Sequence, residues 1–246
     1  QYESMVSWCA YIIRTAESRR GDPQLPREVD SVLWNTGFHF GEWLIPSEKK
    51  GITQKEACER SAFYTAPIFG YVSVKCMAEI ARILQKPEQE DYRRIATQMK
   101  AAIQTALIRD GELRSQNMGA YVLMIAFDLV PDNCKARFAQ RLISILESHN
   151  GCLDTGFLAT PFLLDAFVKI GRRDLAIKLL WQTRMPSWLY EVEQGATSIW
   201  ESWDAILPDG EPSVTSYDHY AFGCVDAWIF ENIAGIRALE PGFRRG

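Results

Sequence analysis

Residues 53–84 read TQKEACERSAFYTAPIFGYVSVKCMAEIARIL, and this stretch predicts the longest helix of the chain. Thr53 is a favoured N-cap residue, and Glu56 follows at the third helical position, so the pair has the spacing of a capping box. Pro87 follows soon after, and proline cannot continue a helix. One long helix is therefore expected over residues 53–84.

The rest of the chain shows the same helical periodicity. Residues 1–19 are amphipathic, with an apolar stripe made of Met5, Trp8, Cys9, Ile12 and Ile13. Further helices are predicted at residues 88–108, 116–129, 132–149, 156–170, 172–183 and 222–235. No strand longer than Tyr190–Glu193 is expected. Helices joined by short turns predict an all-α fold of antiparallel hairpins, as a bundle, a solenoid or a toroid.

Composition narrows the class of protein. The 246 residues are 47% hydrophobic and 24% charged, which is typical of a globular domain with one large core and excludes disorder, collagen and a simple coiled coil. The net charge is −4 without a block of like charges, so nucleic acid is not an expected partner. No apolar run approaches the roughly 20 residues that cross a bilayer, so no membrane partner is expected either. The first residues give no information about targeting, so localisation stays open. The sequence leaves the oligomeric state open as well.

Two long irregular segments, 21–51 and 184–220, hold many of the aromatic and acidic residues. Loops of this length in a compact domain are usually functional. They contain no GxSxG elbow, no glycine-rich phosphate loop and no His or Cys spacing suited to zinc, so no cofactor or metal is expected. The six cysteines are scattered singly and are expected to be buried free thiols, although disulfides remain open.

Tryptophan together with carboxylates suits a carbohydrate ligand, because indole faces stack on the apolar face of a sugar ring and carboxylates bind its hydroxyls. Glu201 lies between Trp200 and Trp203 and is a candidate for acid–base chemistry. Other residues have a simpler interpretation. Trp188 and Trp228 fit a core, Glu191 and Glu193 fit the solvated face of a short strand, and His149 fits the C-terminal end of a helix.

Five short motifs stand in order along the chain, at residues 40–44, 155–157, 186–188, 195–204 and 216–223. Together they resemble motifs of bacterial α-L-rhamnosidases of glycoside hydrolase family 78. Residues 195–204, GATSIWESWD, resemble the family's G-A-T-T-x-W-E-x-W, and residues 216–223, SYDHYAFG, resemble its S-x-N-H-Y-A-F-G. Phe40–Leu44, Thr155–Phe157 and Pro186–Trp188 resemble its F-G-D-W-L, T-G-F and P-S-W. Their order and approximate spacing agree over residues 1–243, so the resemblance covers essentially the whole chain.

The resemblance implies an (α/α)6 barrel and inverting hydrolysis of terminal α-L-rhamnosyl groups from a glycoside or polysaccharide. Glu201 matches the general base, which deprotonates the attacking water. The substrate-binding residues that the resemblance implies are Trp43, Trp188, Trp200, Trp203, His219 and Glu42.

This chain differs from the family pattern in several ways, and these differences change what is expected of its structure and activity. The general-acid segment, D-x-x-x-R-x-E-R-x-x-W-x-x-D, has no counterpart in this chain, and the barrel has twelve helices against the eight predicted here. Glu42 replaces the usual Asp and Asp218 the usual Asn. Residues 1–246 are therefore expected to form one partial barrel, lacking its N-terminal helices and inactive alone. Another sugar-active (α/α)6 enzyme and a non-catalytic carbohydrate-binding or scaffold module remain alternatives.

Overall fold

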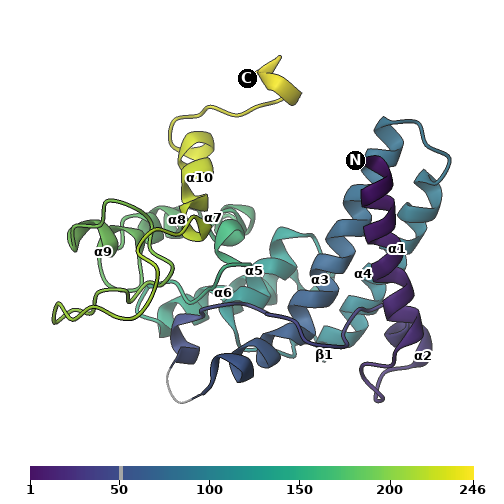
Figure 1. The fold of residues 1–246 in the computed structure, drawn as a ribbon, viewed down its shortest axis with the longest axis horizontal. Helices are drawn as coiled ribbons and strands as arrows, with labels where there is room; N and C mark the ends of the chain where they lie inside the picture. The colour runs from purple at the N-terminus through teal and green to yellow at the C-terminus, as the bar shows by residue number, and fades with distance from the viewer. Residues whose placement is uncertain (50–51) are drawn as a thin grey trace.

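The computed structural model describes residues 1–49 and 52–246, and its ribbon follows an open arc of helices (Figure 1). The α-helices of the described residues are α1 (Tyr2–Ser18), α2 (Arg27–Asp30), α3 (Gln54–Ile83), α4 (Gln89–Leu107), α5 (Met118–Ala126), α6 (Lys135–Ser148), α7 (Thr160–Lys169), α8 (Arg173–Leu180), α9 (Trp188–Glu193) and α10 (Val225–Asn232). Between α4 and α5, the strands β1 (Ile108–Arg109) and β2 (Glu112–Leu113) form a small antiparallel hairpin. The predicted all-α class is confirmed.

The capping box predicted for the longest helix is present. Thr53 Oγ1 accepts the backbone N–H of Glu56 at 3.3 Å, and Glu56 Oε2 accepts the backbone N–H of Thr53 at 2.7 Å. These bonds satisfy backbone donors that the first turn of α3 would otherwise leave free. The helix then continues to Ile83, within one residue of the predicted end.

The helices form an inner and an outer layer. Within the sequence, α3 pairs with α4, α5 with α6, and α7 with α8, as three consecutive hairpins. The first member of each hairpin also contacts the next, so that α3, α5, α7 and α10 follow one another as the inner layer. α1 packs antiparallel against α3, with Tyr2 near Lys86 and Cys9 near Ser73 (Figure 1). The apolar core between the layers includes Ile68, Met77, Ile103, Tyr121 and Phe167.

The connections at the two ends of the helices differ in length. Turns from an inner to an outer helix are short, at 84–88, 127–131 and 170–172. Segments that enter inner helices are mostly long, at 31–53, 149–159 and 181–224. Because inner and outer helices alternate, the inner helices run in one direction and their N-terminal ends share one face. All five sequence motifs lie on that face.

Several local predictions were wrong. Residues 190–193 belong to the helix α9, which Ser187 caps by accepting the backbone N–H of Tyr190 at 3.1 Å, and not to a strand. Trp8 was placed on the apolar stripe of residues 1–19, which was expected to face the core, yet it is 49% exposed. All six cysteines are free, but Cys76 is exposed instead of buried.

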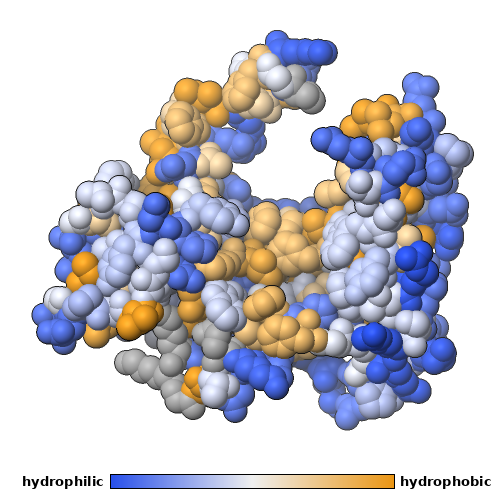
Figure 2. Space-filling model, viewed as in Figure 1, coloured by the Kyte–Doolittle hydropathy of each residue, from blue (hydrophilic) through white to orange (hydrophobic). Residues whose placement is uncertain are grey.

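The space-filling view shows a hollow between the arm that contains α1 and the arm that contains α10, with hydrophobic residues on its floor (Figure 2). Within the described residues, no helix has the length and hydropathy that crossing a membrane requires. The same part of the chain shows no group of three or more His, Cys, Asp and Glu side chains arranged for a metal ion.

Candidate active site

The loops before α3 and α7 are joined by the carboxylate of Glu42. Its Oε1 accepts the backbone N–H groups of Gly156 at 2.6 Å and Ala159 at 3.0 Å. Next to it, the carbonyl oxygen of Trp43 accepts the N–H of Phe157 at 3.0 Å. Two of the five motifs are thus held together directly.

Gly156 is required by this close approach. A Cβ atom placed there would lie 2.0 Å from the carbonyl oxygen of Trp43 and 3.1 Å from Glu42 Oε1. Both distances are shorter than ordinary contacts, so any larger residue would push the two loops apart. The glycine of the T-G-F motif therefore serves loop packing.

Glu42 itself has no exposed surface. Burial raises the pKa of its carboxyl to about 7, although the hydrogen bonds from the two backbone N–H groups lower it. Its second oxygen, Oε2, is buried without a hydrogen-bond partner among the described residues. The resemblance implied substrate binding by Glu42, whereas the geometry has this side chain connecting two loops.

Aromatic contacts connect the remaining motifs. The ring of Phe157 stacks on His219 with centroids 5.0 Å apart and meets Phe222 edge-on at 5.1 Å. Phe222 in turn stacks on Trp203 at 4.1 Å, and its carbonyl oxygen accepts the indole N–H of Trp188 at 2.9 Å. The structure therefore brings Trp188, Trp203 and His219 into one aromatic cluster around Phe157 and Phe222.

Three of the four predicted tryptophans are buried. Trp188, Trp200 and Trp203 are 6%, 2% and 3% exposed, and each packs against other side chains. Trp228, for which a core position was the simpler prediction, is 5% exposed and confirmed in the core. Of the four, only Trp43 is half-buried and presents part of its indole to the hollow.

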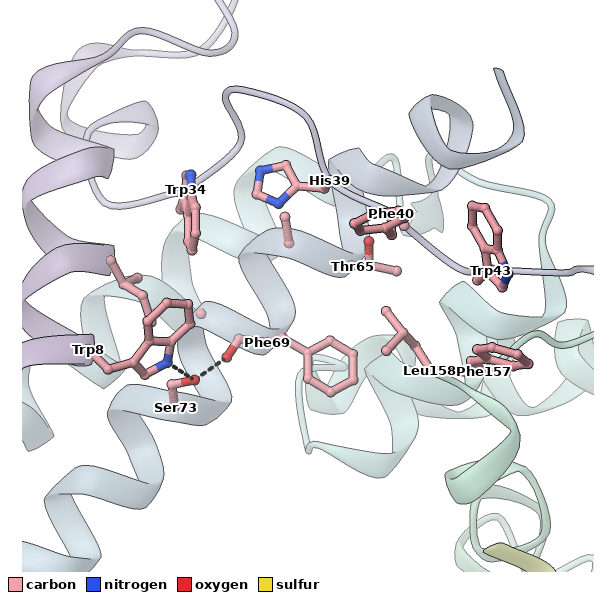
Figure 3. A pocket seen from close by; sticks show the side chains of 14 residues that line it. Trp8, Trp34, His39, Phe40, Trp43, Thr65, Phe69, Ser73, Phe157 and Leu158 are labelled. Atoms are coloured by element: carbon pink, nitrogen blue, oxygen red, sulfur yellow. Dashed lines mark hydrogen bonds between the residues drawn. The ribbon is translucent and has the colours of Figure 1, made fainter. Parts of the chain in front are cut away.

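Trp43 lines a cavity of about 530 Å³, here called the aromatic cavity (Figure 3). Trp8 enters it from α1, and its indole N–H donates to Ser73 Oγ of α3 at 3.4 Å. The other ring-bearing residues of its wall are Trp34, His39, Phe40, Phe69 and Phe157. Trp34 and His39 lie in a segment that the sequence predicted to be functional. Trp8 was not predicted as a site residue, because its helical spacing fitted an apolar stripe.

Glu201 lies outside this wall, in the loop before α10. Its side chain is half-buried, and its Oε2 accepts the N–H of Ser216 at 3.1 Å and the hydroxyl of Thr215 at 3.3 Å. Its own N–H donates to the carbonyl oxygen of Ser216 at 3.0 Å, and His219 N–H donates to Ile199 at 2.8 Å. The segments 199–201 and 215–219 are thus paired, with Glu201 and His219 at the two ends.

Glu191 was predicted to lie on the solvated face of a short strand, and this prediction was wrong. It lies in α9, is 2% exposed, and its Oε2 accepts the backbone N–H of Trp200 at 3.3 Å. Burial raises its pKa to about 7, and the bond from Trp200 lowers it. Glu193, by contrast, is exposed as expected. A two-residue alternation in the sequence concealed a buried carboxyl.

A second cavity, of about 670 Å³, has a wall that mixes polar and apolar residues and includes residues 46–48 of the segment that follows Glu42. Trp203 and Asp154 line it, and Asp154 accepts hydrogen bonds from the N–H and the hydroxyl of Ser47, both at 2.8 Å. His149, predicted as a helix-end residue, follows the last residue of α6 and lies 3.5 Å from Asp154. This cavity borders three of the motif-bearing loops.

In sequence, this chain is similar to known bacterial alpha-L-rhamnosidases. Residues 1–233 match the sequence profile described as the bacterial alpha-L-rhamnosidase 6 hairpin glycosidase domain. The chain is 36% identical to an alpha-L-rhamnosidase of Streptomyces avermitilis over 84% of its length, and 34% identical to one of an Alteromonas species over 99%. It spans 19% and 26% of those relatives.

Solved structures agree with the sequence relatives. The Streptomyces avermitilis alpha-L-rhamnosidase complexed with L-rhamnose superimposes with a TM-score of 0.84 and 31% identity, over 99% of this chain and 22% of that one. The alpha-L-rhamnosidase of Aspergillus terreus gives 0.81 and 28%, over 96% of this chain and 30% of that one. The chain therefore belongs to the six-hairpin glycosidase domain family of the bacterial α-L-rhamnosidases.

Proposed function

We propose that this chain is part of an inverting glycosidase that removes terminal α-L-rhamnosyl groups, with Glu201 as the general base. The observation that carries the proposal is the setting of Glu201. It is a half-exposed carboxylate fixed by Ser216 and Thr215, and it stands in a fold shared with a rhamnosidase that binds L-rhamnose. A general base needs a defined direction and access to water, and this setting provides both.

The hydrogen bonds described for the Glu201 carboxylate both end on Oε2. Oε1 is then the oxygen that accepts a proton from water. As that proton moves to Oε1, the water oxygen attacks the anomeric carbon from the face opposite the leaving group, and the bond to the leaving oxygen breaks. The product keeps the water oxygen at C1 with inverted configuration.

The aromatic cavity supports the sugar ring in this proposal. Trp43 offers an indole face for the C–H face of rhamnose, and the apolar wall suits the methyl group at C6. His219 stacks on Phe157, a lining residue of this cavity, and in this proposal it would bond sugar hydroxyls. Trp188, Trp200 and Trp203 would support the pocket from behind, since they are buried.

The leaving oxygen needs a proton from a second carboxyl group, which stands about 6.5–9.5 Å from the base in inverting enzymes. The family's acidic segment, which has no match in residues 1–246, is the proposed source of that acid. The isolated chain is therefore expected to bind L-rhamnose but to hydrolyse rhamnosides little or not at all.

The test compares the chain with a hybrid in which it replaces the matching 22% of the Streptomyces avermitilis enzyme. Release of nitrophenol from nitrophenyl α-L-rhamnoside should occur with the hybrid and not with the chain, and proton NMR should show the β-anomer first. In the hybrid, Glu201→Gln should lower kcat at least 100-fold, while Glu193→Gln, an exposed neighbour, should not. Robust turnover by the chain alone, or an unchanged rate with Glu201→Gln, contradicts the proposal.

A further inference from the structure

Among the polar contacts that hold the loop of Glu201, one comes from a carboxyl group that plays no part in the proposed chemistry. Glu191 Oε2 accepts the backbone N–H of Trp200, the residue directly before Glu201. We propose that Glu191 is a positioning residue, which fixes the peptide between Trp200 and Glu201 and thereby sets the direction of the base. This inference rests on the proposed role of Glu201.

The helix α9, which carries Glu191, is held in place by hydrogen bonds of its other residues. α9 is held at its start by the Ser187 cap, and Trp188 donates to the carbonyl oxygen of Phe222 at 2.9 Å. Further along, the hydroxyl of Tyr190 donates to the carbonyl oxygen of Ile206 at 2.7 Å. Glu191 therefore projects from a short helix whose neighbouring side chains are already fixed.

The peptide on the receiving side is held from two directions. Trp200 N–H points to Glu191, whereas Glu201 N–H, one residue later, donates to Ser216 at 3.0 Å. Successive N–H groups of an extended segment point to opposite sides, so the two bonds clamp the segment between α9 and residues 215–216. Removing the bond from α9 would leave the peptide between Trp200 and Glu201 held from the side of residues 215–216.

The surroundings of Glu191 do not favour a carboxyl group whose role is only to stabilise the fold. Its other oxygen, Oε1, is buried without a partner among the described residues. Its side chain borders a cavity of about 520 Å³ whose wall is mostly apolar, with Trp188, Ile199 and Ile229 among the lining residues. A buried carboxyl with one unpartnered oxygen costs free energy, and an apolar side chain would fill the same space with less penalty. Stability alone would therefore favour an apolar side chain at this position.

The experiment uses two substitutions of similar shape in the rhamnosidase hybrid. Glu191→Met removes the acceptor for Trp200 N–H, whereas Glu191→Gln keeps a carbonyl oxygen in its place. Glu191→Met should lower kcat at least tenfold and change KM less than twofold, and Glu191→Gln should restore kcat to within about threefold of the parent hybrid. A structural role would instead lower the melting temperature without separating kcat from KM.

A second measurement is independent of activity. In the isolated chain, hydrogen exchange at the Trp200 amide should be slow, become at least tenfold faster in Glu191→Met, and stay slow in Glu191→Gln. Unchanged exchange in Glu191→Met overturns the inference, as does an unchanged kcat in a hybrid that Glu201→Gln inactivates. If Glu201→Gln leaves the hybrid active, the proposed function fails, and the exchange result then decides the structural part alone.

Discussion

Glu42 and Gly156, which are 114 positions apart in the sequence, are joined by a hydrogen bond of 2.6 Å from the backbone N–H of Gly156 to the carboxyl of Glu42. The bond lies where the loops before α3 and α7 meet, beside the wall that Trp43 and Phe157 contribute to the aromatic cavity. Placement of that wall therefore depends on a side chain that has no exposed surface.

Replacing Glu42 by Ala should destabilise the fold strongly. The substitution leaves two backbone N–H groups buried without an acceptor and opens a cavity, with an expected loss of about 3 kcal/mol in the free energy of unfolding. Urea unfolding measures this loss. Glu193→Ala is the matched control, because this exposed glutamate should change stability by less than about 0.5 kcal/mol. Equal effects of the two substitutions would contradict the role assigned to Glu42.

Gly156→Ala should separate the two loops. Because its Cβ would lie 2.0 Å from the carbonyl oxygen of Trp43, the backbone must move, at a cost of about 3 kcal/mol. Thermal melting measures the cost, and L-rhamnose binding should weaken in parallel. Gly223→Ala is the control, since its nearest neighbour would be Ile199 at an ordinary 3.6 Å. A Gly156→Ala variant as stable as the parent would show that the loops can separate freely.

Stability should fall between pH 5 and pH 8. Glu42 and Glu191 have pKa values of about 7 in the fold, against 4.5 as the ordinary value. The fold keeps their protons in a range where the unfolded chain releases them, so their stabilising effect is complete below about pH 4.5 and is lost as the pH rises through 7.

For Glu42 alone the pH-dependent part is on the order of 3 kcal/mol, because it is fully buried. Glu42→Gln should make the urea midpoint less dependent on pH over this range while keeping an acceptor for both N–H groups. An equally steep pH dependence in Glu42→Gln would show that this carboxyl is already ionised in the fold at pH 5.

Two tryptophans should respond differently to truncation. Trp43→Ala should weaken L-rhamnose binding about tenfold with a small change in stability, because its indole is partly exposed at the aromatic cavity. Trp203→Ala should cost about 3–5 kcal/mol of stability, because its buried ring packs between Trp188 and Phe222. Isothermal titration and urea unfolding separate the two effects. A tenfold weaker affinity in a fully stable Trp203→Ala variant would reverse the assignment.

The helices were predictable where the signal was local. The capping box of Thr53 and Glu56 needs four consecutive residues, and the start of α3 followed from it. α9 could not be found in this way, because a six-residue helix is too short to show its period. Its alternating glutamates imitated a strand, and the Ser187 cap was the one signal that could have identified it.

The candidate site was predictable only in part, because burial is a property of the assembled loops. The sequence identified the loop of Glu201 as functional and stacked aromatics as its partners. It did not separate Trp43, which borders the aromatic cavity, from Trp200, which is enclosed with Tyr190 and Ala205. Trp8 was predicted in the core since its helix spacing matches that of Ile12, yet the hollow beside α1 leaves its ring half-exposed.

The unequal connections at the two ends of the inner helices have a practical consequence for attaching this protein to a surface. The turn at 170–172 is on the end away from the motif-bearing loops, and a Cβ atom at Gly171 would meet nothing within 4 Å. An immobilisation tag inserted there would leave the Trp43 and Glu201 loops facing the bulk solution. The same separation lets loop libraries be exchanged on one end while the hairpin turns on the other stay constant as the frame.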